Sequence, residues 1–142
     1  HFYKSKIAMK IRNIKRVFYS NSADAPHSIS SDTVRVVLSA LTEIPVQPFP
    51  KLEISEKKEG GQRIYTAKLN LRTTDDTLSS LDRKVFYALD INDMVWILGS
   101  QTRPYPIVTK SVSLPESAQD NQLNSFQIDY SSTLPILYKP AT

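Results

Sequence analysis

The stretch from Lys84 to Ser113 reads KVFYALDINDMVWILGSQTRPYPIVTKSVS, and it indicates the fold more clearly than any other part of the chain. It holds two apolar runs, Val85 to Ile91 and Met94 to Leu98, on either side of the pair Asn92-Asp93. Both runs are rich in β-branched and aromatic residues, and Asn and Asp tolerate positive φ in a tight turn. This combination predicts a β-hairpin.

The same stretch continues into a third strand. The second apolar run ends at Gly99, which is one of only three glycines in the chain. The segment Arg103 to Pro106 then turns the chain into a third strand, Ile107 to Val112. We therefore predict a three-stranded meander at the centre of the fold, with the rest of the chain layered on it.

Apolar and polar side chains alternate with a period of two on both sides of this meander, which predicts further strands. Upstream, Lys51 to Lys57 and Gln62 to Arg72 are expected to form a second hairpin that turns at Gly60-Gly61. Thr33 to Leu41 is predicted as a strand with apolar residues on both faces. Downstream, Leu123 to Ser131 is predicted as a strand that follows a long polar loop.

The N-terminal segment has a mixed pattern. Ile7, Met9 and Ile11 alternate with small or polar residues, but the phase of the alternation breaks near Asn13. A strand with a bulge, or a strand that bends at Arg12-Asn13, accounts for this break. A helix is the alternative, because the apolar residues 7, 11, 14 and 18 also fit helical spacing. We favour the strand.

Two segments differ from the strand pattern. Ile44 to Pro50 holds three prolines, which exclude a central strand and favour a stiff crossover between sheets. A proline-rich ligand for a partner groove is the alternative. Thr73 to Arg83 is the one helix candidate, with Thr74 or Asp75 as its cap. Its aspartates also resemble a carboxylate metal site, but capping explains them directly.

Length and composition agree with one domain. A chain of 142 residues buries roughly two-thirds of its unfolded surface. The absence of cysteine excludes a disulfide scaffold, a thiolate metal site and a cysteine nucleophile. No apolar run is long enough to span a membrane, and no signal-peptide pattern is visible. We predict a mainly β fold: a single-domain antiparallel β-sandwich or barrel-like fold over residues 1–142, with one short helix and extended terminal arms at 1–20 and 133–142.

The charge is unevenly distributed. Residues 1–20 contain six lysines and arginines and no acidic residue, whereas the whole chain has a net charge of +4, so the remaining residues sum to −2. One interpretation is a basic segment that contacts phosphate or an acidic partner surface. The other is an exposed strand whose solvent face carries lysine and arginine, which also discourages unwanted edge pairing.

The sequence offers no catalytic, cofactor-binding or metal-binding residues that we would assign. The only internal histidine, His27, lies in a polar loop, and no Gly-x-Ser-x-Gly or phosphate-binding loop is present. Three zinc ligands at workable spacing are also absent. We therefore predict a protein that is not an enzyme and that needs no cofactor.

Residues 50–132 resemble a known class of proteins. They contain a charged hairpin, a short Asp/Thr/Leu segment, a strand–turn–strand that ends in Leu-Gly-Ser, the proline loop Arg-Pro-Tyr-Pro, and a final alternating strand, Phe126 to Ser131. This series is similar to the small structural proteins of the tail and head–tail joining region of tailed bacteriophages and prophages, especially those of Bacteroides-type hosts. The turn Asn92-Asp93 differs from the Asp-Gly that is usual in those proteins.

The resemblance implies a structural subunit of a virion, assembled in the bacterial host cytoplasm into a ring or tube. The expected partners are further copies of the chain and other virion proteins, with possible non-specific DNA contact through the basic segment. The residues expected at subunit interfaces are Lys4, Lys6, Lys10, Arg12, Lys15, Arg16, Arg103, Pro104, Tyr105, Pro106, Leu134, Ile136, Leu137 and Tyr138.

Two alternatives belong to other functional classes. A monomeric β-sandwich binding module for a carbohydrate or a host surface would use exposed Trp96 and Tyr105 to stack on a sugar ring. A nucleic-acid-binding β-barrel would use the basic segment with nearby aromatic residues, and its DNA binding would depend steeply on salt. Trp96 lies between Val95 and Ile97, which favours a core position over a surface platform.

Overall fold

The computed structural model describes residues 8–21, 38–74, 78, 83–100, 103–111, 124–133 and 136–140. The elements in these ranges are nine strands and one short 3₁₀ helix. In chain order they are β1 (Ala8–Asn21), η2 (Leu38–Ala40), β2 (Thr42–Ile44), β3 (Lys51–Glu59), β4 (Gln62–Thr73), β5 (Lys84–Asp90), β6 (Met94–Leu98), β7 (Ile107–Ser111), β8 (Asn124–Ser132) and β9 (Leu137–Pro140).

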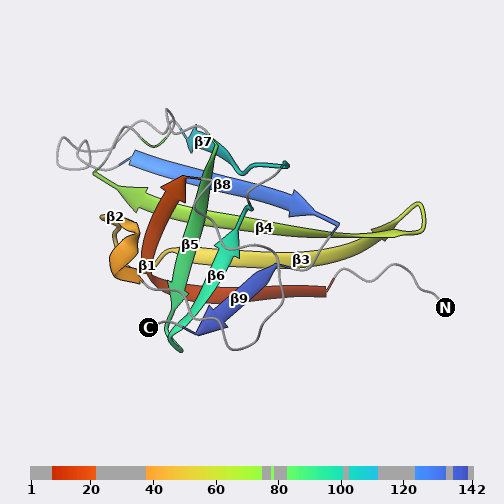
Figure 1. Ribbon diagram of the computed structural model, residues 1–142, viewed down its shortest axis with the longest axis horizontal. Coiled ribbons are helices and arrows are strands. Elements are labelled where there is room, and N and C mark those ends of the chain that lie inside the picture. Colours follow the sequence, from red (N-terminus) through yellow and green to blue (C-terminus); the bar gives the residue numbers. More distant parts are fainter. Residues whose placement is uncertain are drawn as a thin grey trace.

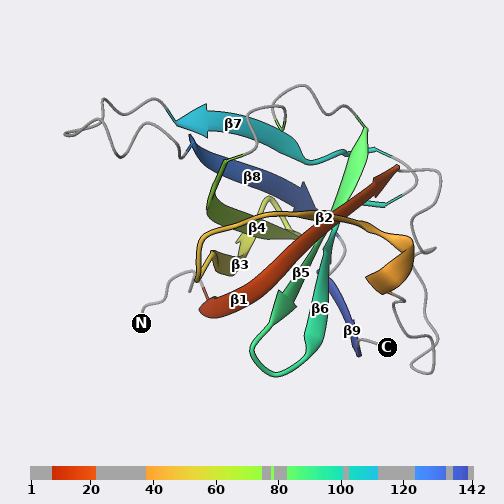
Figure 2. The same cartoon turned by 90° about the vertical axis from the view of Figure 1, so that its left-hand side faces the viewer.

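The strands form one antiparallel sheet, with the order β7-β8-β4-β3-β1-β5-β6-β9 and with β2 attached to β1. The sheet is strongly curled into a half-barrel (Figures 1 and 2). The prediction of a mainly β, antiparallel, barrel-like fold is therefore confirmed. The two parts that the curl brings face to face are β7-β8-β4-β3 and β5-β6-β9, and they share β1.

The long strand β1 bends where it passes from one part of the sheet to the other. Residues 8–13 pair with β3, and residues 14–21 pair with β5, with a register shift between Ile14 and Arg16. A bulge lets one strand turn without losing its partners, because the extra residue is left out of the ladder. The predicted strand with a bulge is confirmed, and the helical alternative is wrong for the described residues 8–21.

The proline-containing segment between β2 and β3 lies beside this bend. Both β2 and β3 run antiparallel to β1, β2 along residues 17–19 and β3 along residues 8–13. Two backbone hydrogen bonds hold the segment between them: Ile14 N donates to Pro50 O at 2.9 Å, and Gln47 N donates to Arg72 O at 2.8 Å. The segment is thus a crossover between the two parts of the sheet, as its prolines indicate.

The main hydrophobic core lies on the concave side of the curled sheet, with contributions from both parts. Its most deeply buried large side chains are those of Ile14, Ile44, Leu52, Leu69, Leu78, Phe86, Leu98, Phe126 and Ile128. Trp96 belongs to this core and is only 8% exposed. A second cluster covers the opposite face of β5 and β6, so these two strands are buried on both faces.

The hairpin of β5 and β6 forms as predicted, and Asp90 organises its turn. One oxygen of the buried Asp90 carboxylate accepts hydrogen bonds from the backbone N–H groups of Asn92 and Met94, at 2.8 and 3.0 Å. The other accepts from Trp96 Nε1 at 2.9 Å. Asp93 has a φ of 65°, the left-handed value that Asp tolerates in such a turn.

Gly99 ends β6 at a place where only glycine fits. Its φ is 119°, and a Cβ atom there would lie 3.1 Å from both Pro106 Cδ and Val85 Cγ2. The proline loop after β6 therefore packs directly on the backbone at the end of the hairpin. This contact fixes where the chain turns toward β7.

The prediction of a strand over Thr33 to Leu41 is wrong in its described part. Leu38–Ala40 forms a 3₁₀ turn, in which Leu41 N donates to Leu38 O at 3.0 Å. In a 3₁₀ helix residues i and i+3 lie on the same side, so Leu38 and Leu41 can both pack on the second cluster. Residues 33–37 lie outside the described part of the chain.

Two further predictions concern the helix and the arms. Of the helix predicted from Thr73 to Arg83, residues 75–77 and 79–82 lie outside the described residues, as does the polar loop before Leu123. The terminal segments, predicted as a basic N-terminal strand or arm and a C-terminal arm, are strands where the structure describes them. Residues 8–20 lie in β1, in the middle of the strand order, and residues 137–140 form β9, which pairs with β6 at one edge of the sheet. Paired backbone groups make both segments parts of the sheet rather than free extensions.

Candidate functional site

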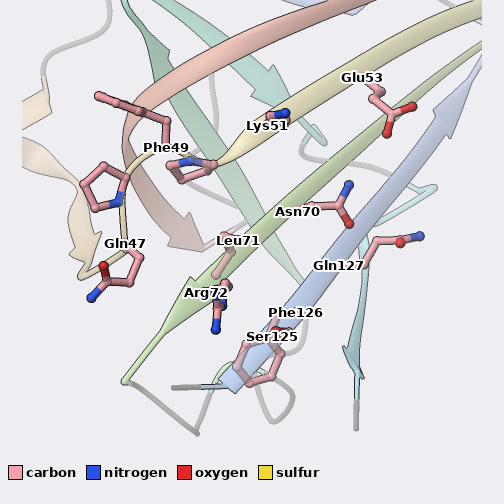
Figure 3. Close-up of a pocket in the computed structure, with 12 residues that line it drawn as sticks. Gln47, Phe49, Lys51, Glu53, Asn70, Leu71, Arg72, Ser125, Phe126 and Gln127 are labelled. Carbon is pink, nitrogen blue, oxygen red and sulfur yellow. The ribbon is translucent and has the colours of Figure 1, made fainter. Parts of the chain in front are cut away.

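An open pocket of about 510 Å³ lies on the face of β3, β4 and β8 that points away from the core (Figure 3). Lys51, Asn70 and Gln127 are direct partners on these three strands, so their side chains form one cross-strand row. Neighbouring Cβ atoms in such a row are about 5 Å apart, close enough for one small ligand to contact all three side chains.

Two more rows complete the polar floor of the pocket. Arg72 on β4 pairs with Ser125 on β8, two residues along from Asn70 and Gln127. On the other side, Glu53 lies two residues after Lys51 on β3 and also lines the pocket; its partner on β4 is Lys68. The floor therefore has its two cationic side chains, Lys51 and Arg72, toward one end and the carboxylate of Glu53 toward the other.

The proline-containing crossover forms one wall of this pocket. Phe49 lies between Pro48 and Pro50 and is 62% exposed, which is unusual for a large aromatic side chain. The hydrogen bond from Gln47 N to Arg72 O ties the crossover to the end of β4. The aromatic ring is thus carried by a segment that is stiffened by prolines and anchored to the sheet that forms the floor.

Only some of the polar side chains that line the pocket form hydrogen bonds with other side chains of the protein. Gln127 Nε2 donates to both oxygens of Asp129, at 2.8 and 3.1 Å, which orients the amide and leaves its carbonyl oxygen as a possible acceptor. Within the described part of the chain, the side chains of Lys51, Asn70 and Arg72 make no hydrogen bond or ion pair. Donors and acceptors are therefore available to a ligand.

The structure places the described basic residues of the N-terminal segment elsewhere, along β1. Lys15 Nζ pairs with Asp93 Oδ1 at 2.7 Å, and Arg16 binds both oxygens of Glu43, at 2.9 and 2.7 Å. The Arg12 guanidinium lies over the Trp96 ring, 5.5 Å from its centroid. Of the four cations on β1, only Lys10 points into solvent without such a contact among the described residues.

Among the described residues, the Arg16–Glu43 pair is the one place where pKa values are clearly shifted. The hydrogen bonds from Arg16 are the main cause that lowers the pKa of Glu43 below its ordinary value, with the opposite charge of Arg16 adding to it. The same contacts raise the pKa of Arg16. Both side chains are about half exposed, so solvent weakens this interaction.

The other residues expected at subunit interfaces are scattered. Arg103 and Pro104 are exposed, Tyr105 is half-buried, and Pro106 packs on Gly99. Ile136 is 7% exposed and belongs to the core, while Leu137 and Tyr138 lie in β9 opposite Ile97 and Trp96. Lys4, Lys6 and Leu134 lie outside the described residues. The structure does not bring the described members of this set together in one site, and their interface role stays a prediction.

The pocket was not predicted from the sequence, although parts of its signal are visible there. The outward positions of the second hairpin are polar, and an aromatic residue between two prolines is a poor candidate for a core position. What the sequence does not show is the pairing of β4 with β8, a strand about 60 residues further on, which completes the row at Gln127.

No protein-family model, curated protein or solved structure matches this chain. Within the described residues, no group of three His, Asp or Glu side chains could hold a metal ion. Asp75, Asp76 and Asp82, weighed above as metal ligands, lie outside those residues. No helix in the described ranges is long and apolar enough to cross a membrane.

Proposed function

We propose that this chain is a non-enzymatic structural subunit that assembles with copies of itself into a ring or tube, as a tail or head–tail joining component of a bacteriophage virion. The observation that carries the assembly is the open sheet, whose strand order ends in β7 on one side and β9 on the other. The virion context rests on the sequence resemblance over residues 50–132.

An open edge strand can pair with a strand of another molecule. The outer edges of β7 and β9 have no partner strand within the described residues, and β7 carries Ile107, which is 65% exposed. When the two edges that pair are different, the contact is head-to-tail, and repeated contacts close into a ring or continue as a tube. The two different edges of this sheet meet that condition.

The structure changes which residues we expect to carry the assembly. Three of the four cations on β1 contact Glu43, Asp93 or Trp96 of the same chain, and this weakens the expectation that the basic segment lies at a subunit interface. The same pairing weakens the nucleic-acid alternative, because few of these charges remain for phosphate. Trp96 is buried, so a surface sugar platform built on it has no support. The edge strands are the better candidates.

The test is the mass of the native protein across a range of concentrations, by light scattering and native mass spectrometry. We expect a discrete oligomer that the substitution Ile107→Lys on β7 dissociates, because a lysine on an edge strand opposes pairing with another strand. Ile91→Lys is the matched control, since Ile91 is 54% exposed but lies at the turn between β5 and β6.

Two results would overturn the proposal. One is a monomer at every concentration for the unmodified chain. The other is an oligomer that is equally stable with Ile107→Lys and Ile91→Lys, which would exclude pairing at the β7 edge. Far-UV circular dichroism of both variants verifies that each is folded before its mass is compared.

A further inference from the structure

The first half of β1 has an open edge. Residues 8–13 of β1 pair with β3 on one side, whereas pairing with β5 on the other side begins only at Ile14. Figure 1 shows this half of β1 running alongside β3 and away from β5. Up to residue 12, no backbone hydrogen bond from the described part of the chain reaches this second side. The side chains of Lys10 and Ile11 are exposed, so solvent has access to the edge.

The ladder between β1 and β3 determines which backbone groups point to this edge. In an antiparallel pair, residues whose N–H and C=O groups bond to the neighbouring strand alternate with residues whose groups point away from it. Ile14 N donates to Pro50 O on the β3 side, and Asn13 O accepts from Ile91 N on the opposite side. The alternation therefore turns the N–H and C=O groups of Ile11 toward the open edge.

An extended peptide can complete such an edge by adding a strand. The N–H and C=O groups of Met9 and Ile11 would bond to it, while those of Lys10 and Arg12 stay in the ladder with β3. All strand pairs in the described sheet are antiparallel, so we expect an antiparallel strand here as well. Backbone bonds alone do not select a sequence, and the side chains beside the edge must do so.

Two cations beside the edge lack an anionic partner among the described residues. Lys10 and Arg12 project to the concave side of the sheet, in the same rows as Ile54 and Leu52, and neither forms an ion pair. The Arg12 guanidinium lies over the Trp96 ring, and its Nε is buried without a hydrogen-bond partner. A buried donor without an acceptor costs free energy, and a carboxylate supplied from outside would lower that cost.

The edge therefore favours a particular alternation of side chains. Residues of an added strand point alternately to the two faces of the sheet, like those of β1 itself. The positions opposite Lys10 and Arg12 face these cations, and opposite charges at directly opposed positions stabilise a strand pair. The position between them points to the other face, beside Ile11, which is 60% exposed. A strand that reads acidic–apolar–acidic suits all three positions.

The edge strands of a second copy do not offer this pattern. Both β7 and β9 contain a lysine and no acidic residue. Like charges directly opposite each other destabilise a strand pair, so these strands are poor partners for an edge that carries Lys10 and Arg12. The cations that discourage pairing with a second copy favour an acidic strand from a different protein.

We propose that the open edge of β1 at residues 9–12 receives an extended acidic segment of another protein. The segment adds an antiparallel strand beside β1, places carboxylates next to Lys10 and Arg12, and packs an apolar side chain against Ile11. The edges of β7 and β9 remain available for assembly, so this contact can form in a monomer or in a ring.

The test is isothermal titration calorimetry with two capped peptides. The acidic peptide TEVEVEVT alternates glutamate with valine, and its counterpart TKVKVKVT carries lysine in place of glutamate. We expect the acidic peptide to bind with a dissociation constant on the order of 0.1 mM. The lysine peptide should bind at least about tenfold more weakly, because its charges oppose those of β1. Binding of the acidic peptide should weaken as the salt concentration rises.

N-methylation of the acidic peptide distinguishes strand addition from charge attraction alone. In the proposed pairing, the valine opposite Ile11 exchanges both backbone hydrogen bonds with it, whereas the N–H groups of the glutamates point away from β1. Methylation of the valine nitrogens should therefore weaken binding at least about tenfold. Methylation of the same number of glutamate nitrogens is the matched control and should preserve binding.

Variants then assign the binding to β1. Lys10→Glu should weaken binding of the acidic peptide at least about tenfold and strengthen binding of the lysine peptide. Lys110→Glu is the matched control, because it makes the same charge change at an exposed lysine on the other edge strand, β7. It should leave both affinities unchanged. Far-UV circular dichroism verifies that both variants are folded.

The proposal fails in any of four cases. The first is no binding of the acidic peptide at millimolar concentration. The second is equal loss on methylation of valine and of glutamate, and the third is equal loss in Lys10→Glu and Lys110→Glu. The fourth is a thymidine oligonucleotide of about 12 nucleotides that binds more tightly and displaces the peptide, which would make nucleic acid the ligand. The native mass without peptide is measured separately, so failure here is distinguishable from failure of the assembly proposal.

Discussion

A few single residues determine how the β5–β6 hairpin is built and where it ends. Asp90 accepts three hydrogen bonds from the turn and from Trp96, and so links the turn to the core. The sequence places this residue inside an apolar run, where a carboxylate is unexpected, but it does not reveal its partners. A buried carboxylate is stable only when such donors surround it.

Gly99 provides the prediction at this scale. Gly99→Ala should lower the free energy of unfolding by about 2–4 kcal/mol, because it combines an unfavourable positive φ with close contacts of the new Cβ to Pro106 and Val85. Gly60→Ala is the control, since Gly60 also has a positive φ but a Cβ there meets nothing within 4 Å. It should cost only about 1–2 kcal/mol.

Urea denaturation followed by Trp96 fluorescence measures both values. Equal losses in the two variants would mean that backbone strain alone accounts for the effect. In that case the contact of Pro106 with the end of β6 would contribute nothing to the requirement for glycine.

At the scale of elements, β1 is the strand on which the architecture depends. Its sequence predicts both a strand and a break near Asn13, because alternation and its loss of phase are local signals. The sequence also predicts the β3–β4 and β5–β6 hairpins, since each needs only neighbouring residues and a turn. It does not predict which strands β1 joins, because those partners lie far along the chain.

The difference between local signals and distant partners also explains why one predicted strand was wrong and why the pocket was not predicted. The strand predicted at Thr33 to Leu41 is replaced over Leu38–Ala40 by a 3₁₀ turn, because packing on the second cluster outweighs a local strand preference. The candidate pocket needs three strands and a crossover to meet on one face. The hairpin that the sequence predicts contains only part of the polar floor, namely Lys51, Glu53, Asn70 and Arg72. The sequence alone therefore places more than half of the polar floor residues on one predicted hairpin.

The ion pair between β1 and β2 provides the prediction for an element. The pKa of Glu43 is lowered in the folded state from its ordinary value of 4.5. The pair therefore stabilises the protein fully at pH values above 4.5, and this stabilisation is lost as the pH falls through the folded-state pKa. Glu43→Gln should therefore be less stable than the unmodified chain near neutral pH, by less than about 1 kcal/mol because both groups are half exposed.

The measurement is urea unfolding of both proteins at about pH 7 and about pH 3, where the difference should close. The control is Glu59→Gln, because Glu59 makes only a 3.8 Å contact with Lys57 and is 64% exposed. Its stability should follow that of the unmodified chain at both pH values. A Glu43→Gln difference that persists at low pH would show that the ion pair is not its cause.

At the scale of the whole molecule, the two parts of the sheet depend on each other. They share β1, and their core side chains form one cluster across the concave side. A structure of this kind has no interface at which one part could separate and keep its core. It should therefore behave as one cooperative unit.

We expect a single unfolding transition in urea. Trp96 fluorescence reports on the part that contains β6, and far-UV circular dichroism reports on all strands, so the two curves should have the same midpoint. Separate midpoints would show that the β7-β8-β4-β3 part and the β5-β6-β9 part unfold independently. Dilution over a tenfold range of protein concentration distinguishes this case from dissociation of an oligomer.

The place of β1 in the chain also bears on how the protein is made. β1 leaves the ribosome before β5, which pairs with its second half and is complete only at Asp90. At 5–20 residues per second, the intervening stretch of about 70 residues takes on the order of ten seconds to translate. During that time the apolar residues Ile14, Val17 and Phe18 lack their final neighbours, which makes the nascent chain a substrate for chaperones that bind exposed apolar segments.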